Sequence, residues 1–116
     1  MRDLEETIAQ LSQVSRLMDE ATKEVEDYDS LYVQWKVQHL KEHTKAFLQA
    51  NGAMDMRKAT ADLAAMESLE HREHADVGLR AAKERLRTLR DQMEILRTTA
   101  AAQRVQFMAE PTGQWS

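Results

Sequence analysis

Residues 47–55 read Phe-Leu-Gln-Ala-Asn-Gly-Ala-Met-Asp, and the Asn51-Gly52 pair is the strongest helix-stop signal before Pro111. Asparagine and glycine both tolerate the left-handed backbone conformation that closes a helix. No proline lies on either side of this pair until Pro111. We therefore expect a chain reversal here, with one long helix before it and one long helix after it.

The predicted fold is all-α. We expect a helix over about residues 4–50, a turn at 51–55 and a second helix over about 56–109. At 1.5 Å per residue these helices are about 70 Å and about 80 Å long. Residues 1–110 would form one domain, a long antiparallel helical hairpin, followed by a flexible tail at 111–116 in which Trp115 is either disordered or a partner anchor. Gly78 would lie opposite residues 28–30, so a two-tier bundle of four shorter helices is the alternative.

An apolar stripe with alternating spacings of three and four residues favours coiled-coil packing of both helices. On the first helix the stripe runs through Leu11, Val14, Met18, Ala21, Val25, Tyr28, Tyr32 and Trp35, then shifts by one residue to Leu40, His43, Phe47 and Ala50. On the second it runs through Met56, Ala59, Leu63 and Met66, and again through Ala82, Leu86, Leu89, Met93, Leu96, Ala100 and Phe107. We place Asp55 as the cap of the second helix.

Composition fits long helices that associate. The chain has 116 residues, 31% of them charged, with only three glycines and two each of Trp, Tyr and Phe. An extended hairpin buries less of its surface than a sphere of equal mass, so we expect a homo-oligomer. The absence of cysteine excludes disulfides and thiolate chemistry. No segment resembles a signal peptide or a membrane span, which predicts a soluble, cytoplasmic protein without a membrane partner.

Charge alternates in blocks along the chain. Residues 1–30 hold nine acids and three bases, and residues 31–58 hold two acids and five bases. Residues 59–76 hold five acids and one base, and residues 77–110 hold four acids and seven bases. This pattern indicates either pairing of oppositely charged zones between subunits or an anionic ligand on the basic zones.

The histidines offer a metal-site hypothesis that we weigh against a plainer interpretation. His39 and His43 match H-x-x-E-H, a spacing that holds zinc in some metallopeptidases. Those enzymes take a third carboxylate ligand from another helix, so a chance match on a charged helix is favoured here. His71 and His74 on the facing arm would complete a four-histidine site, but solvated surface histidines are the simpler interpretation. We therefore expect no metal, no cofactor and no enzymatic activity.

Two groups of basic residues are candidate DNA-binding sites. The first surrounds the predicted turn, near the rings of Trp35 and Phe47, and consists of Lys36, Lys41, Lys45, Arg57 and Lys58. Cations beside aromatic rings are typical of single-stranded nucleic-acid binding, although both rings also lie on the apolar stripe. The second group serves either DNA binding or an oligomer interface and follows one edge of the second helix: Lys83, Arg87, Arg90, Arg97 and Arg104.

Two short elements carry a family resemblance. The stretch Lys45-Ala46-Phe47-Leu48-Gln49-Ala50-Asn51-Gly52, with Leu31-Tyr32-Val33-Gln34-Trp35 upstream, resembles the UvsY-type recombination mediators of bacteriophages. In that family a Lys-Ala-Arg-Leu segment before a glycine turn contributes to binding of single-stranded DNA. Here Phe47 stands at the arginine position, so Lys45 alone corresponds directly, and Arg57 and Lys58 would substitute.

The resemblance implies an oligomer, expected to be a ring, that binds single-stranded DNA, displaces the single-strand-binding protein and loads a RecA-like recombinase without catalysis. A phage-encoded mediator would act in the host cytoplasm. One alternative is a structural coiled-coil adaptor whose basic zones meet acidic zones of neighbouring subunits. Another is a small phage inhibitor of a host nuclease that uses residues 1–30 as a nucleic-acid mimic.

Overall fold

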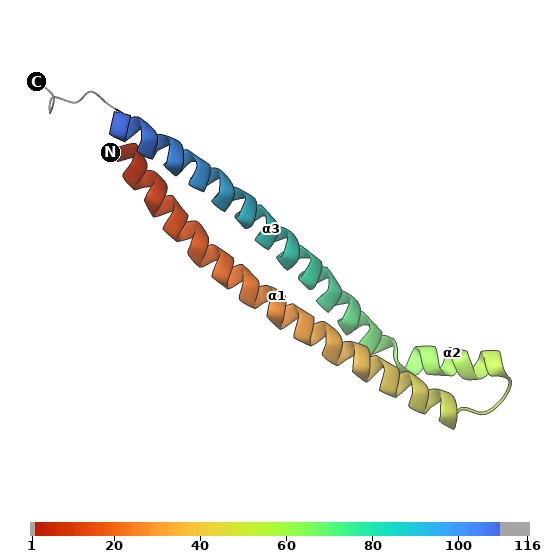
Figure 1. The fold of residues 1–116 in the computed structure, drawn as a ribbon. Coiled ribbons are helices and arrows are strands. Elements are labelled where there is room, and N and C mark those ends of the chain that lie inside the picture. The colour runs from red at the N-terminus through yellow and green to blue at the C-terminus, as the bar shows by residue number, and fades with distance from the viewer. Residues whose placement is uncertain (1, 110–116) are drawn as a thin grey trace, which may run out of the picture. The chain divides into compact units, whose positions relative to one another are not determined.

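A computed structural model describes residues 2–109, which form three helices (Figure 1). Helix α1 spans Arg2–Gln49, α2 spans Met54–Ala64 and α3 spans Met66–Ala109. The all-α prediction is confirmed for these residues. The four-helix alternative is wrong, because α1 runs without a break through residues 28–30 and α3 runs through Gly78. The tail with Pro111 and Trp115 lies outside the described residues.

The reversal after α1 lies where Asn51-Gly52 predicts it. Gly52 adopts a φ of 105°, a conformation that side-chain-bearing residues rarely adopt. The expected cap at Asp55 is wrong, because α2 begins at Met54 with Ala53 at the N-cap position and no side-chain cap. Asp55 instead lies in the first turn, where its carboxylate complements the positive end of the helix.

A helix break at Ala65 separates α2 from α3, whereas the sequence predicted one helix over 56–109. Ala65 has φ −101° and ψ 9°, away from α-helical values. Ala65 is bonded on both sides: its N donates to Ala61 O in the last turn of α2 (3.1 Å), and its O accepts from Leu69 N in the first turn of α3 (3.1 Å). No proline or glycine stands at this position, so no local residue pattern predicts the break.

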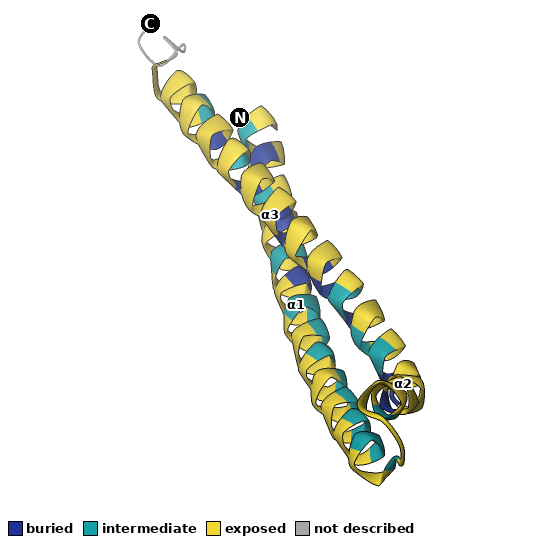
Figure 2. Ribbon diagram, turned by 90° about the vertical axis from the view of Figure 1, so that its right-hand side faces the viewer, coloured by how far each residue is buried: buried dark blue, intermediate teal, exposed yellow. Residues whose placement is uncertain are grey.

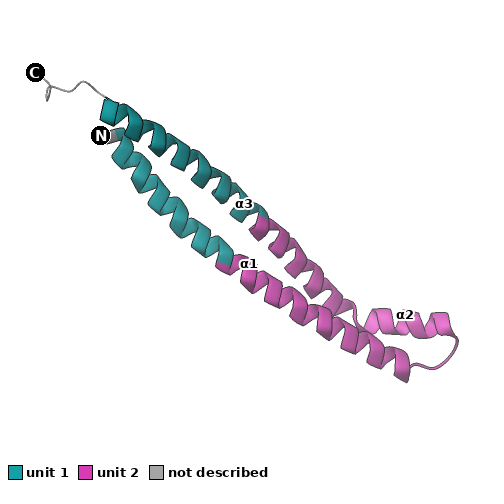
Figure 3. Cartoon of the chain, in the orientation of Figure 1, with its two compact units in different colours: residues 1–22, 84–116 teal, residues 23–83 magenta. Residues whose placement is uncertain are grey.

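The chain divides into two compact units (Figure 3). Unit 1 comprises residues 1–22 and 84–116, and its two helical segments from α1 and α3 lie side by side. Unit 2 comprises residues 23–83, in which α2 and the start of α3 pack back against the second half of α1. Each unit is therefore a pairing of helical segments that are distant in the sequence.

The buried positions, shown in Figure 2, recur at alternating spacings of three and four residues. Some of these seam positions hold polar residues. On α1 after Trp35 the predicted position of Leu40 is wrong, because Leu40 is exposed, whereas His43, Phe47 and Ala50 are half-buried as predicted and so are His39, Glu42 and Ala46 beside them. The apolar stripe predicted at the start of the second helix is likewise wrong, because Met56, Ala59, Leu63 and Met66 are exposed. The inner positions there are Ala61, Ala65 and Ser68, and Phe107 at the other end of the predicted seam is exposed too.

The sizes of the seam residues are complementary within each unit. In unit 1, α1 contributes the buried residues Thr7, Val14 and Ala21, and α3 contributes mostly larger ones, Leu86, Leu89 and Met93, with Ala100 as the small exception. In unit 2 the order is reversed: α1 contributes partly buried aromatic rings, whereas the buried residues of α2 and α3 include four alanines and Ser68. Tyr28 is the tightest case, because a Cβ added at Gly78 would lie 2.7 Å from its Cζ and closer still to two other ring carbons.

Candidate nucleic-acid interface

The basic residues around the turn lie in unit 2 and differ in their exposure and in their bonding. Lys36, Lys41, Lys45 and Lys58 are exposed and make no ion pair with any described residue. Arg57 differs, because its side chain is half-buried and held within the fold. The structure thus leaves four lysines of this group available to an external anion.

Arg57 binds the end of α1. Its Nη2 and Nε donate to the carbonyl oxygen of Phe47 at 3.2 and 3.4 Å, and the guanidinium carbon lies 4.7 Å from the centroid of the Phe47 ring. The last carbonyls of a helix have no intrahelical partner and carry partial negative charge, so a cation is favourable there. Arg57 therefore stabilises the turn, a role that its sequence position did not reveal.

The two aromatic rings considered for base stacking are also engaged inside unit 2. Trp35 is half-buried and stacks on His71, with ring centroids 4.2 Å apart and an interplanar angle of 18°. One face of the Phe47 ring is occupied by Arg57. One face of each ring is thus taken by a residue of unit 2, and both residues are half-buried, so these rings offer less stacking surface to a base than exposed aromatic side chains would.

Lys41 and Lys45 border an apolar surface. Together with Leu40, Thr44, Leu48 and Gln49 they line a shallow, open groove of about 500 Å³ on the outer side of α1. Leu40 and Leu48 are among the most exposed leucines of the chain. A mixed surface of this kind, with cations at the edge of exposed leucines, favours a protein partner over bare phosphate.

The α3 basic residues, Lys83, Arg87, Arg90, Arg97 and Arg104, are all exposed along one helix. Arg87 is paired with Glu84 of the same helix, with Nη2 and Oε1 2.7 Å apart, and this hydrogen bond raises the pKa of the guanidinium. The other four make no ion pair within residues 2–109. The structure thus places a row of uncommitted cations where the heptad spacing predicted them.

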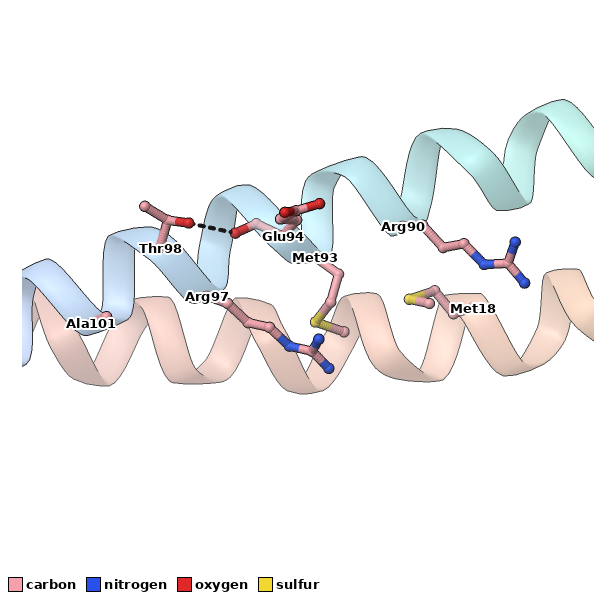
Figure 4. Close-up of a pocket in the computed structure, with 7 residues that line it drawn as sticks. All are labelled: Met18, Arg90, Met93, Glu94, Arg97, Thr98 and Ala101. Carbon is pink, nitrogen blue, oxygen red and sulfur yellow. Dashed lines mark hydrogen bonds between the residues drawn. The ribbon is translucent and has the colours of Figure 1, made fainter.

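Arg90 and Arg97 flank the main groove of unit 1, an open depression of about 610 Å³ (Figure 4). Both side chains extend from α3 toward α1, with the thioethers of Met93 and Met18 between them. Glu94 is the one carboxylate that lines the groove. Two guanidinium groups above a soft apolar floor can hold phosphate oxygens by paired hydrogen bonds and leave room for a sugar or base.

A layer of polar side chains crosses unit 2. Nδ1 of His39 lies 3.1 Å from the carbonyl oxygen of Ala65, so this nitrogen carries the proton and donates it at the helix break. Ser68, only 1% exposed, lies 2.8 Å from Glu42 Oε2 and 3.0 Å from Ala65 O, and its hydroxyl can donate to either oxygen. Hydrogen bonds from Gln38 and then from Ser68 lower the pKa of Glu42.

Two of the histidines, His39 and His43, contact the opposite arm of unit 2. His43 Nε2 contacts Asp62 Oδ1 at 2.8 Å, whereas His39 binds Ala65, so the two rings turn to different partners. Within residues 2–109 no three His, Asp or Glu side chains are grouped as metal ligands. The H-x-x-E-H pattern is thus explained by cross-helix hydrogen bonding, with its Glu42 bound to Ser68.

Comparisons with known proteins give no relative against which to read these surfaces. No family model matches the chain, no curated protein matches it, and no solved structure resembles it closely enough to count as a match. None of the helices within residues 2–109 has both the length and the apolar character of a bilayer span. The function must therefore be inferred from the surfaces of the protein itself.

Proposed function

We propose that this chain is an oligomeric single-stranded DNA-binding protein that acts as a recombination mediator, with the phosphates bound along the α3 arginine row. The observation that supports it is the pair Arg90 and Arg97, exposed, without ion pairs among the described residues, and placed on both sides of an open groove. The lysines near the turn border exposed leucines and are therefore the weaker candidates for phosphate contacts.

The spacing of the row suits a nucleic-acid strand. Arg90, Arg97 and Arg104 recur every seven residues, about 10 Å along the helix, so successive guanidinium groups can meet different phosphates of one strand. Each guanidinium binds phosphate through two parallel hydrogen bonds. Because the chain has a net charge of −4, one subunit binds weakly, and repetition of the row in an oligomer supplies affinity through avidity.

The mediator role adds a protein partner to DNA binding. The resemblance of residues 31–35 and 45–52 to UvsY-type mediators supports the loading of a RecA-like recombinase onto DNA covered by single-strand-binding protein. Loading requires simultaneous contact with DNA and recombinase but no covalent chemistry. The proposed protein is accordingly a non-enzymatic assembly factor.

Fluorescence anisotropy of a labelled oligothymidylate, titrated at several salt concentrations, tests the DNA-binding step. The double variant Arg90→Glu/Arg97→Glu should lose binding, and the single variants should reduce the salt slope by about 0.7 for each lost phosphate contact. The control Arg16→Glu/Lys23→Glu reverses two exposed charges on α1 and should bind as the wild type does. Equal losses in both double variants, or no binding by the wild type at low salt, would refute the proposal.

A coiled-coil adaptor without nucleic-acid binding is the second candidate, and the exposed apolar residues of unit 2 favour it. Such an adaptor would associate through apolar surface, which salt affects little, whereas phosphate binding weakens steeply as salt rises. A protein that forms oligomers at all salt concentrations but leaves the oligothymidylate anisotropy unchanged would be assigned to this class.

A further inference from the structure

Exposed apolar residues gather on the outer side of both arms of unit 2. On α1 they form the α1 outer stripe, defined as Val33, Val37, Leu40, Thr44 and Leu48. On α2 and the first residue of α3 they form the α2 outer stripe, defined as Met56, Ala59, Leu63 and Met66. In both stripes the spacings are three or four residues, as in an inner seam. Each stripe is thus a second helix-packing surface that its own subunit does not cover.

In the first half of α1 the outer face of the helix is polar and exposed to solvent. The positions equivalent by heptad to Val33 and Leu40 are Glu5, Ser12, Asp19 and Glu26, all exposed and polar. The change to valine and leucine after residue 30 is therefore specific to unit 2. Isolated exposed apolar residues are normal on proteins, but a stripe repeated at heptad spacing on two neighbouring helices indicates a partner.

The two stripes lie on the sides of their helices that face away from the inner seam. Val37 and Thr44 follow the inner residues Trp35 and Glu42 by two positions, and Leu63 follows Ala61 by two, which is about 200° around the helix in each case. The two stripes of one subunit therefore point to opposite sides of unit 2. A partner that covers one stripe leaves the other free for a further partner.

The charges beside the two stripes are opposite. Lys36, Lys41 and Lys45 flank the α1 outer stripe, whereas Asp55, Asp62 and Glu67 outnumber one base, Lys58, beside the α2 outer stripe. An anionic membrane surface would attract the first stripe and repel the second. Two copies of the same stripe would bring like charges together, whereas one stripe of each kind brings opposite charges together.

We propose that the occupant is a second copy of this chain, with the α1 outer stripe of one subunit packed against the α2 outer stripe of the other. Every copy carries both complementary halves on opposite sides, so the contact repeats from one copy to the next and forms a ring where the repeat closes. This contact does not involve the arginine row of α3 and does not depend on DNA binding.

Sedimentation equilibrium of the full chain without DNA provides the first test. The wild type should exceed the monomer mass of 13.4 kDa, and Leu40→Ser/Leu48→Ser should weaken association about 100-fold, about tenfold for each leucine. Ile95→Ser/Val105→Ser is a matched control, because these residues are 64% and 68% exposed against 64% and 69% for Leu40 and Leu48. A monomeric wild type, or equal effects of the two double variants, would overturn the proposal.

Charge reversal provides the second test and separates this contact from a general loss of folding. In the variant Lys41→Glu/Lys45→Glu, acidic residues flank both stripes of a copy. In the variant Asp55→Lys/Glu67→Lys, basic residues flank both. Each variant alone should associate at least tenfold more weakly than the wild type. An equimolar mixture should recover association, because every contact in a mixed complex again joins opposite charges. Failure of the mixture to associate while both variants keep wild-type helicity would overturn the proposal.

Discussion

Replacement of Gly78 by alanine should have opposite effects on stability in the presence and absence of the Tyr28 ring. Both residues lie in unit 2, and an added Cβ would stand 2.7 Å from Tyr28 Cζ, so the ring must move. Overpacking of this kind costs about 1–3 kcal/mol. Alanine in place of glycine inside a helix contributes about 1 kcal/mol of stability. The net expectation for Gly78→Ala in the wild type is therefore a loss of up to about 2 kcal/mol.

A double-mutant cycle isolates the contact. In the Tyr28→Ala background, Gly78→Ala should instead stabilise the chain by about 1 kcal/mol, so the coupling free energy should be about 1–3 kcal/mol. Urea unfolding followed by circular dichroism gives each free energy, at one protein concentration because association shifts the apparent stability. Ala81→Gly, at an exposed site of α3, calibrates the helix propensity and should cost about 1 kcal/mol. If Gly78→Ala stabilises the wild type as much as the Tyr28→Ala variant, the close packing of ring on glycine is refuted.

Three further substitutions test the turn and the polar layer. Gly52→Ala should destabilise the chain by about 1–2 kcal/mol, measured by urea unfolding, because the residue has a φ of 105°; an unchanged midpoint would contradict this conformation. Arg57→Ala should lower the free energy of unfolding by about 1–2 kcal/mol, because the hydrogen bonds to the end of α1 are lost. Lys58→Ala, at the exposed neighbouring position, should lower it little. Hydrogen bonds from Gln38 and Ser68 hold the pKa of Glu42 below its ordinary value of 4.5. The stabilising contribution of the ionised Glu42 carboxylate is therefore complete above pH 4.5 and is lost as the pH falls through the pKa of the folded state. Glu42→Gln should therefore lower the urea midpoint at neutral pH and have a smaller effect in acid below pH 4.5; an equal deficit at both would exclude the ionised carboxylate as the cause.

The inner seam of unit 1 and the position of the turn were predictable from the sequence. Val14, Leu86 and Leu89 are apolar at heptad spacing, and Asn51-Gly52 is a local signal that needs no tertiary information. Both features depend on short-range chemistry, for which a single sequence is sufficient.

The seam of unit 2 was not predictable by counting apolar residues. Its inner positions include His39, Glu42 and Ser68, which become acceptable in a seam only through hydrogen bonds to the opposite arm. Met56 and Leu63 repeat at the same heptad spacing on the outer side. Periodicity shows that a helix has an apolar face, but it does not distinguish a face covered by the same chain from one covered by another.

The candidate site was predictable in composition but not in the roles of its members. Heptad spacing of Arg90 and Arg97 placed them on one edge of a helix, and both lie beside the same groove. The commitment of Arg57 to the carbonyl of Phe47 was hidden, because it depends on the approach of two helix ends. The break at Ala65 was equally hidden, since its backbone is bound by a histidine 26 residues away.

The placement of large seam residues on one arm and small ones on the other favours one alignment of the two helices, whereas a heptad repeat alone allows several. If one helix slid along the other by seven residues, about 10 Å, every seam position would again face a seam position. Tyr28 would then leave Gly78, which has no side chain, and meet either His71 or Arg85, and Trp35 would lose its stacking on His71. A shift of one heptad would lose both the close packing of Tyr28 on Gly78 and the stacking of Trp35 on His71, which favours the observed alignment of the arms in unit 2.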